Sequence, residues 1–331
     1  MISFIIIGRN EGWKLTKCLQ SVYQTIEYNN LKDYEVIYVD SKSTDDSIER
    51  AKQFNNIKIF QITGVYNAAI ARNIGAKESK GEILFFVDAD VELLPDFIPH
   101  VLINNHSVLK YDCVAGYLDN IFYDENWDFI KRAPQGYTDL KQTNITTRSV
   151  NGGIFLIKKE IWELAKGMRS KYRKNQDLDL ALRLSKKGIH FTRVPFLMGI
   201  HHTIDYRHQN RMWQSIISGN LLYPSVTTRD HLFYLPKIKH TVRRQYTAIL
   251  LLMFVLTIFF DILSFVLLFT YLILLFLKVY RNTKQAGRNK GSSLLYFLNR
   301  SLNQFISDIL FWVGFIAFHP SSKKAIYKRV S

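Results

Sequence analysis

Residues 247–277 form an apolar stretch of 31 residues whose one charged residue is Asp261. A single straight helix of that length would measure about 46 Å at 1.5 Å per residue, whereas the hydrocarbon core of a bilayer is about 30 Å thick. We therefore expect a break near Asp261 and two helical halves that form a hairpin or a re-entrant pair in a membrane. A buried hairpin of a water-soluble protein remains the alternative.

Basic residues flank this stretch on both sides, and such residues favour the cytoplasmic side of a membrane. They are Lys237, Lys239, Arg243 and Arg244 before it, and Lys278, Arg281, Lys284, Arg288 and Lys290 after it. We expect both flanks on the same, cytoplasmic, side. A further apolar segment, about 294–318, is followed by Lys323, Lys324, Lys328 and Arg329. We expect an interfacial helix there, with these basic residues near anionic headgroups.

The net charge divides the chain into two regions. The chain holds 44 Lys and Arg against 28 Asp and Glu, a net charge of +16. Residues 237–331 hold 14 Lys and Arg against 2 Asp and Glu, a net charge of +12. Residues 1–236 hold the remaining 30 Lys and Arg against 26 Asp and Glu, a net charge of +4. The excess therefore does not indicate a nucleic-acid-binding protein, since the N-terminal region shows no recognition helix or RNP-like strand. We expect a cytosolic domain over 1–236 and a basic membrane-attachment region over 237–331.

Apolar runs alternate with amphipathic stretches in the first 90 residues, as in an open parallel α/β sheet. The segments are 2–7, 13–23, 35–39, 46–54, 57–60, 67–77 and 83–87. Ligands of such sheets bind at the carboxyl ends of the strands, and polar residues follow the first, third and seventh of these segments. The GxGxxG and GxxxxGK[ST] phosphate loops do not occur in the sequence.

Four sequence motifs together resemble the family 2 glycosyltransferases with a GT-A fold. They are EVIYVDSKSTDDS, AIARNIGAKESKGEILFFVDADVEL, NGGIFLIKKEIW and QDLDLALRL, which occur in this order within residues 35–184. The resemblance covers about residues 1–200 and implies an α/β fold with an open mixed sheet flanked by helices. The apolar C-terminal region resembles the membrane-attached branch of that family, which carries C-terminal membrane helices.

Asp88 and Asp90 follow the apolar run 83–87 as a DxD motif. Alternate residues of a strand end point the same way, so the two carboxylates converge and repel each other unless a cation lies between them. Mg²⁺ or Mn²⁺ is satisfied by one or two carboxylates and substrate phosphate oxygens, and the resemblance implies this use of the motif. The resemblance also implies that a histidine after the last strand, His201 or His202, can complete the coordination shell of the metal, and a structural histidine is an equal alternative. For the DxD motif itself, the alternative is a surface turn.

The resemblance implies that Asp177 is the catalytic base. An inverting transfer needs a carboxylate that accepts the proton of the acceptor hydroxyl during its attack on the anomeric carbon. The family usually has Glu-Asp at this position, where this chain has Gln176-Asp177. The chain therefore lacks the flanking carboxylate and keeps the proposed base. An ordinary acidic residue in the first turn of a helix is the alternative.

The remaining candidates bind the nucleotide-sugar donor. The resemblance implies that Asp40 contacts the nucleotide base, and the alternative is a carboxylate that caps a helix. Arg72 resembles a basic residue that faces the donor, although an ordinary helix-face arginine fits as well. Gly152 and Gly153 allow the backbone to approach the sugar, and a plain turn would explain them too.

These observations predict a membrane-attached, metal-dependent, inverting glycosyltransferase of the hexosyltransferase type. It would transfer a sugar from a nucleoside-diphosphate sugar to a lipid-linked or polysaccharide acceptor, in cell envelope glycan biosynthesis, with its catalytic domain on the cytoplasmic face. A retaining GT-A transferase and a non-catalytic membrane scaffold that keeps the fold are the alternatives.

Overall fold

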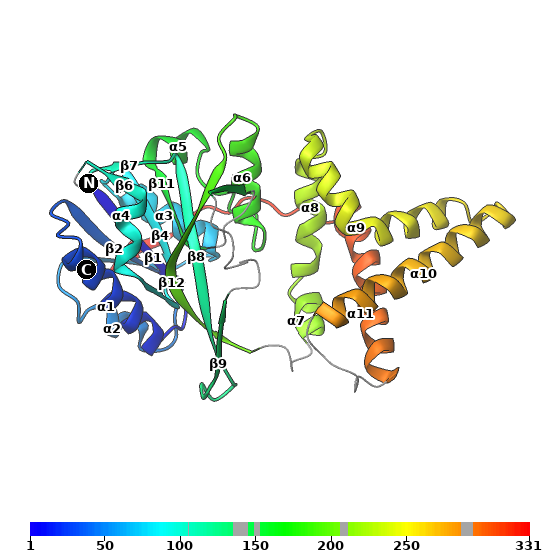
Figure 1. The fold of residues 1–331 in the computed structure, drawn as a ribbon, viewed down its shortest axis with the longest axis horizontal. Coiled ribbons are helices and arrows are strands. Elements are labelled where there is room, and N and C mark those ends of the chain that lie inside the picture. Colours follow the sequence, from blue (N-terminus) through cyan, green and yellow to red (C-terminus); the bar gives the residue numbers. More distant parts are fainter. Residues whose placement is uncertain (105, 135–144, 149–152, 206–210, 286–293) are drawn as a thin grey trace. The chain divides into compact units, whose positions relative to one another are not determined.

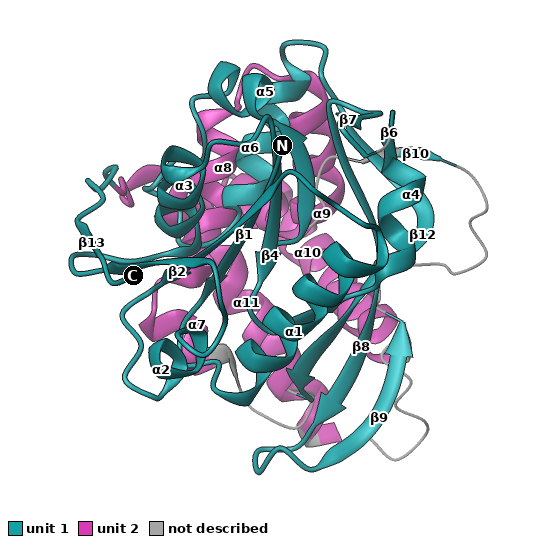
Figure 2. Cartoon of the chain, turned by 90° about the vertical axis from the view of Figure 1, so that its left-hand side faces the viewer, with its two compact units in different colours: residues 1–209, 321–331 teal, residues 210–320 magenta. Residues whose placement is uncertain are grey.

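The computed structural model describes residues 1–104, 106–134, 145–148, 153–205, 211–285 and 294–331. The chain divides into two compact units: unit 1 comprises Met1–Gln209 and Ser321–Ser331, and unit 2 comprises Asn210–Pro320 (Figure 2). The division falls after residue 209 rather than after residue 236, because helix α8 (Tyr223–Asp230) packs against the helices that follow it. The last residues of the chain return to unit 1, so this unit is discontinuous in sequence.

Unit 1 alternates strands and helices along its first part (Figure 1). Its elements are β1 (Ile2–Gly8), α1 (Trp13–Tyr28), β2 (Tyr34–Asp40), α2 (Ser47–Ala51), β3 (Ile57–Ile62), α3 (Ala68–Glu78), β4 (Ile83–Asp88), β5 (Val91–Leu93), η1 (Pro95–Phe97), α4 (Ile98–Val101), β6 (Leu102–Ile103), β7 (Val108–Leu109), β8 (Cys113–Tyr123), β9 (Phe129–Pro134), β10 (Thr146–Arg148), β11 (Phe155–Lys158), α5 (Lys159–Leu164), α6 (Gln176–Ser185), β12 (Phe191–Ile204) and β13 (Tyr327–Arg329). The alternation expected for the first 90 residues is confirmed.

Eleven of the described strands of unit 1 form a mixed sheet in the order β10-β12-β8-β11-β4-β1-β2-β3-β13, with β5 on β12 and β9 on β8. Strands β6 and β7 pair with each other in a separate two-stranded sheet. Strands β4, β1, β2 and β3 are parallel neighbours, whereas β11 and β13 run antiparallel to theirs. In register, Gly8 lies opposite Asp40, and Ile7 lies opposite Asp88. The polar ends of three strands therefore meet at one edge of the sheet, and the expected mixed α/β architecture is confirmed.

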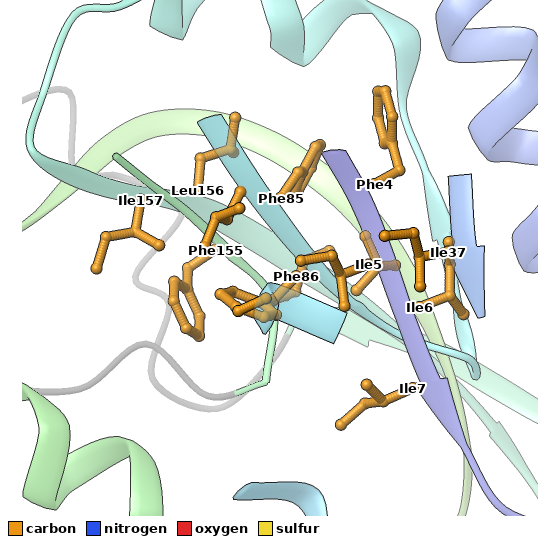
Figure 3. Packing of buried hydrophobic residues seen from close by; sticks show 14 of the residues in the cluster. Phe4, Ile5, Ile6, Ile7, Ile37, Phe85, Phe86, Phe155, Leu156 and Ile157 are labelled. Atoms are coloured by element: carbon orange, nitrogen blue, oxygen red, sulfur yellow. The ribbon is translucent and has the colours of Figure 1, made fainter. Parts of the chain in front are cut away.

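The core of unit 1 lies on both faces of these parallel strands, as their near-continuous apolar runs require. Phe4, Ile5 and Ile6 of β1 and Phe85 and Phe86 of β4 are almost completely buried (Figure 3). Burying one such side chain stabilises the fold by about 1.5–3 kcal/mol. The core thereby fixes the strand ends that carry the polar residues.

Unit 2 is helical in its described residues. Its elements are α7 (Arg211–Ile217), η3 (Asn220–Leu222), α8 (Tyr223–Asp230), α9 (Leu235–Leu256), α10 (Asp261–Gln285) and α11 (Leu294–Ile316). Helices α9 and α10 pack against each other, and the break between them at residues 257–260 agrees with the break expected near Asp261. Among the described helices, α10 alone contains a segment long and apolar enough to cross a membrane, Asp261–Thr283.

Helix α11 contributes a completely buried carboxylate, Asp308, to unit 2. The Thr247 hydroxyl of α9 and the Tyr271 hydroxyl of α10 donate hydrogen bonds to it, at 3.0 and 3.2 Å, and Gln304 donates a third at 2.8 Å. Because buried polar groups need such partners, Asp308 ties three helices together. A membrane location of these helices stays a prediction.

The C-terminal segment differs from the expectation for it. Its basic residues were expected near lipid headgroups, but Tyr327–Arg329 form β13, the edge strand beside β3. The physical reason is that the apolar residues of the segment bind the core: Ala325, Tyr327 and Val330 pack against the core of unit 1, while Lys328 and Arg329 are exposed.

Candidate active site

A pocket of about 420 Å³ lies at the polar edge of the sheet. Among its lining residues are Asp88 at the end of β4, Asp90 just after it, Arg72 of α3, Gly153 before β11, and Asp177 of α6. These five residues were singled out from the sequence for one site, and the fold brings them to one pocket from segments far apart in the chain. The convergence follows from the topology, because β1, β4 and β11 are successive neighbours in the sheet.

Arg72 holds Asp88 in place at the wall of the pocket. Its side chain is only 2% exposed, and its Nη2 donates hydrogen bonds to Asp88 Oδ1 at 2.6 Å and to the Gly153 carbonyl oxygen at 2.9 Å. Burial raises the pKa of Asp88 above its usual value, Arg72 opposes that rise, and neighbouring Asp90 adds to it. Arg72 thus lines the pocket, as expected, but its guanidinium group is committed to positioning a carboxylate.

Gly153 approaches the same pair more closely than any other residue type could. A Cβ built on Gly153 would overlap the Asp88 carboxylate and lie 2.6 Å from Arg72 Nη2. The absence of a side chain is therefore required for the geometry of Asp88 and Arg72. Gly152, its predicted companion, lies outside the described residues.

Asp90 pairs with His201, which is located on β12. The two side chains approach to 3.2 Å between Asp90 Oδ2 and His201 Nε2, and His201 Nδ1 lies 2.9 Å from Asn120 Oδ1. Burial lowers the pKa of His201, but the hydrogen bond and the charge of Asp90 outweigh burial and leave that pKa raised. Conversely, burial raises the pKa of Asp90, and His201 outweighs this effect, so the pKa of Asp90 is lowered.

His202 faces the other way, because successive residues of a strand point to opposite faces. Its ring is buried, with Nδ1 2.8 Å from the Tyr123 hydroxyl and Nε2 2.5 Å from Glu92 Oε1. Its side chain therefore does not reach Asp90. Of the two histidines that the sequence left open, the geometry places His201 beside the DxD motif.

The donor atoms at this end of the pocket fit a hard divalent cation. Asp88 and Asp90 offer carboxylate oxygens and are 35% and 25% exposed, and His201 offers a ring nitrogen. In the described part of the chain, no group of three or more His, Cys, Asp or Glu residues is arranged to hold a metal by itself. An ion here would need further oxygen ligands, and substrate phosphates and water are what Mg²⁺ and Mn²⁺ accept.

Asp177 lies in the first turn of α6 and lines the pocket. Its Oδ1 accepts a hydrogen bond from the Leu178 amide at 2.8 Å. Its neighbour Asp179 is fully buried and pairs with Arg183, four residues further along the helix, at 2.8 Å and with Arg169 at 3.2 Å. The structure therefore separates the two acids of this turn: Asp179 anchors the helix, and Asp177 faces the pocket.

Asp40, predicted to contact the nucleotide base, is completely buried and is not among the residues that line the pocket. It accepts hydrogen bonds from the Tyr38 hydroxyl at 3.1 Å, from the Ser43 amide at 2.9 Å and from Gln61 Nε2 at 3.4 Å. These partners come from β2, β3 and the turn after β2. Asp40 holds this turn together, and the adjacent Ser41 contributes to the pocket in its place.

Glu11 lines the pocket, although no role was predicted for it from the sequence. It follows β1, lines the pocket, and forms an ion pair with Lys14 at 2.5 Å. Burial and then the charge of Asp90 raise the pKa of Glu11, and Lys14 opposes this. Its position in the polar segment after the first strand was a usable signal, since ligands bind at such strand ends.

One family model matches the N-terminal part of the chain. The sequence model described as Glycosyl transferase family 2 matches residues 3–164. This match supports a family 2 glycosyltransferase domain in unit 1. It includes Arg72, Asp88, Asp90 and Gly153 and ends before Asp177.

Several characterised proteins are similar over part of their length. Glycosyltransferase AglE of Haloferax volcanii is 37% identical over 93 residues, which are 27% of this chain and 30% of that protein. The dolichol-phosphate mannosyltransferase of Mycosarcoma maydis is 25% identical over 191 residues, 55% of this chain and 64% of that protein. The chain thus spans about a third to two thirds of these two relatives.

One solved structure, Staphylococcus aureus TarS residues 1–349 in complex with UDP-GlcNAc, aligns with 61% of this chain and 58% of its own. Its sequence is 13% identical and its TM-score is 0.45. This likeness is too low to establish a shared fold. The names of the relatives and the family match support a glycosyltransferase.

Proposed function

We propose that this protein transfers a sugar from a nucleoside-diphosphate sugar to an acceptor hydroxyl, with inversion at the anomeric carbon. The observation that carries the proposal is the meeting of Asp88, Asp90 and Asp177 in one pocket at the polar edge of the sheet. Such an arrangement offers both an anchor for a charged diphosphate and a separate carboxylate for proton transfer. The family match supports the same reaction class.

The metal and diphosphate end of the site is formed by Asp88, Asp90 and His201. These residues would hold Mn²⁺ or Mg²⁺, which would neutralise the charge that develops on the leaving diphosphate. Arg72 fixes Asp88 through its hydrogen bond at 2.6 Å, so the carboxylate need not reorganise when the donor binds. Preorganised groups of this kind supply much of an enzyme's transition-state stabilisation.

At the acceptor end of the site, Asp177 is the proposed general base. The acceptor hydroxyl oxygen forms a new bond to the anomeric carbon while the bond from that carbon to the diphosphate oxygen breaks. The hydroxyl proton passes to the Asp177 carboxylate, and the diphosphate leaves with the bonding electrons. A positioned base of this type contributes about 10²- to 10⁴-fold to the rate.

We further propose that the acceptor is a lipid-linked glycan or a polysaccharide at the cytoplasmic face of a membrane. Helix α10 is long and apolar enough to cross a bilayer, and basic residues lie in the first half of α9 and follow the apolar part of α10. A relative that is named as a dolichol-phosphate mannosyltransferase supports a lipid acceptor. Basic residues on both flanks favour a hairpin with both ends in the cytoplasm.

Two variants test the separate roles of the carboxylates. Asp90→Ala should lose metal-dependent nucleotide binding together with turnover, because the ion loses a ligand. Asp177→Asn should bind nucleotide and metal normally, and its transfer rate should fall by about 10²- to 10⁴-fold because the amide keeps the shape and loses the basicity. Turnover is measured with detergent-solubilised protein, Mn²⁺ and a panel of nucleotide sugars, as the release of UDP or GDP. Binding is measured separately, by titrating Mn²⁺ in a nucleotide-binding assay.

The outcomes of this test are distinct. Undiminished Mn²⁺-dependent binding in Asp90→Ala would refute the metal assignment. An Asp177→Asn variant that retains more than about a tenth of the wild-type rate, above the range expected for a general base, would show that another residue is the base. A product with the donor's anomeric configuration would identify a retaining transferase, and no turnover with any donor would favour the non-catalytic scaffold.

A further inference from the structure

The last residues of the chain form an edge strand of the sheet that carries the site. Strand β13 pairs antiparallel with β3, with Tyr327 opposite Ile62 and Arg329 opposite Phe60. Figure 2 shows β13 and the C-terminus in unit 1, on the side of the sheet that carries β2 and away from β8. The segment 321–331, called the C-terminal strap below, is thus part of the unit that contains the pocket.

The strap fixes the beginning of the loop that follows β3. The Ile326 carbonyl accepts hydrogen bonds from the Thr63 amide at 2.9 Å and from the Gly64 amide at 3.2 Å. This loop, residues 63–67, leads into α3 and contains Tyr66 and Asn67, which line the 420 Å³ pocket. The whole loop also lines an adjoining pocket of about 670 Å³.

A second contact of the strap reaches the other end of this loop. The Ser170 hydroxyl donates a hydrogen bond to the Lys323 carbonyl at 2.8 Å and accepts one from the Lys323 amide at 2.9 Å. The Ser170 carbonyl in turn accepts a hydrogen bond from Asn67 Nδ2 at 2.8 Å. Asn67 Oδ1 accepts from the Ile70 amide at 2.8 Å and so caps α3.

A third contact holds the far end of α3. The Tyr327 hydroxyl donates a hydrogen bond to Glu78 Oε1 at 2.6 Å and accepts one from Lys77 at 3.1 Å. The strap therefore braces α3 at both ends. Because Arg72 lies in the middle of this helix and holds Asp88, the contacts connect the strap with the proposed metal site.

We propose that the C-terminal strap is a positioning element of the donor site. It holds loop 63–67 and the start of α3 in the conformation that receives the nucleoside diphosphate, and this proposal rests on the proposed function. A loop that is ordered before its ligand arrives loses little further entropy on binding. Loss of the strap contacts should therefore weaken nucleotide binding more than it slows the chemical step.

The competing explanation is that the strap only protects the edge of the sheet, since unpaired strand edges invite aggregation. A strap with that role alone would affect melting temperature and solubility. It would leave the nucleotide affinity of the folded protein unchanged. Nucleotide affinity and loop mobility are therefore the readouts that separate the two roles.

Lys328 offers a matched pair of full-length variants. Its side chain is exposed, and its backbone lies opposite Gln61 in the β13–β3 ladder. Lys328→Pro removes the backbone N–H, which a paired strand does not tolerate, and Lys328→Ala removes the same charge and keeps the backbone. Any difference between the two variants thus reports on strand docking rather than on charge.

Two quantities are measured for both variants: amide hydrogen exchange of residues 63–67, and the dissociation constants of UDP and GDP with Mn²⁺. For Lys328→Pro we expect exchange at Thr63 and Gly64 to rise at least about tenfold and the dissociation constant of the bound nucleotide to rise about tenfold. The rate at saturating donor should change less than the Michaelis constant for the donor. Lys328→Ala should match the unaltered protein in all these quantities.

Two additions keep the result interpretable. A synthetic peptide of residues 321–331, added to Lys328→Pro, should restore nucleotide affinity, whereas a scrambled peptide should not. Ser170→Ala removes both hydrogen bonds to Lys323 without touching the strand pairing. Ser170→Ala should also raise the dissociation constant of the nucleotide. If Lys328→Pro fails to fold, Ser170→Ala is used for the test in its place.

The outcomes separate this inference from the proposed function. If the unaltered protein binds neither UDP nor GDP, this would refute the proposed nucleoside-diphosphate-sugar donor, and the role of the strap would be refuted with it. A Lys328→Pro protein whose loop exchanges faster but whose nucleotide affinity is unchanged would overturn the strap's role and leave the function intact. The same holds if Ser170→Ala binds nucleotide as tightly as the unaltered protein.

Discussion

Replacing Gly153 by alanine tests whether the position of Asp88 matters for the reaction. The added Cβ would overlap the Asp88 carboxylate and lie 2.6 Å from Arg72 Nη2, where ordinary contact begins at 3.4 Å. Arg72 Nη2 would therefore have to move by about 0.8 Å, and the Asp88 carboxylate by more, to restore normal contact distances. Displacements of about 1 Å near a reacting centre cost about 100-fold in rate, which corresponds to about 2.7 kcal/mol of activation free energy.

The assay is the initial rate of nucleotide release with saturating Mn²⁺, together with thermal unfolding of the same preparation. Gly116→Ala is the matched control, because a Cβ there would lie 2.5 Å from the Phe196 carbonyl oxygen and 2.6 Å from Phe97 Cε2, in the core and away from the pocket. Both variants should lose about 1–3 kcal/mol of stability through overpacking, but only Gly153→Ala should lose turnover in the folded fraction. A Gly153→Ala enzyme within threefold of the unaltered rate would refute the reasoning.

Two further predictions concern stability and topology. Glu35 is nearly buried and accepts hydrogen bonds from Ser3 and Lys58, both at 2.6 Å; although burial raises its pKa, these bonds outweigh burial and lower it. Its stabilising effect is therefore fully present above about pH 4.3 and is lost as the pH falls through the lower folded-state pKa. Glu35→Gln should unfold about 1.5–3 kcal/mol more easily than the unaltered protein at pH 7, and this difference in stability should shrink as the pH falls below about 4.3; a pH-independent difference would contradict this. Single cysteines at Lys239 and Arg281, in a background without Cys18 and Cys113, should both resist an impermeant thiol reagent until cells are lysed; labelling of position 281 alone in intact cells would show a single crossing.

The sequence was a good guide where function and fold depend on local patterns. The run ILFFV predicted a buried strand that ends at Asp88, and its register beside β1 brings Asp88 and Asp90 to the polar edge. Asp179 could be assigned to Arg183 by their i,i+4 spacing alone. In these cases, the two interacting residues are close in sequence, or the periodicity of a single strand or helix determines where a side chain lies.

Other features depended on partners that no local pattern identifies. Asp40 ends a strand as a ligand-binding carboxylate would, yet its carboxylate accepts hydrogen bonds from Tyr38 and Gln61. Gln61 belongs to the next strand, so the sequence around Asp40 does not reveal this contact. The choice between His201 and His202 required the register of β12 against β5 and β8. The strap was assigned to a membrane surface because its lysines stand out in the sequence, whereas its pairing with β3 joins residues more than 250 positions apart.

The discontinuity of unit 1 also has a consequence for the order in which the protein is made. About 110 residues of unit 2 separate Gln209 from the returning segment that begins at Ser321. At typical synthesis rates of about 5–20 residues per second, the ribosome needs roughly 5–20 s to produce them. During this interval the outer edge of β3 has no partner strand in the nascent chain, although the rest of the sheet has already been synthesised. The final strand of unit 1 is thus synthesised only after the whole of unit 2, so completion of the proposed catalytic unit has to wait until unit 2 has been synthesised.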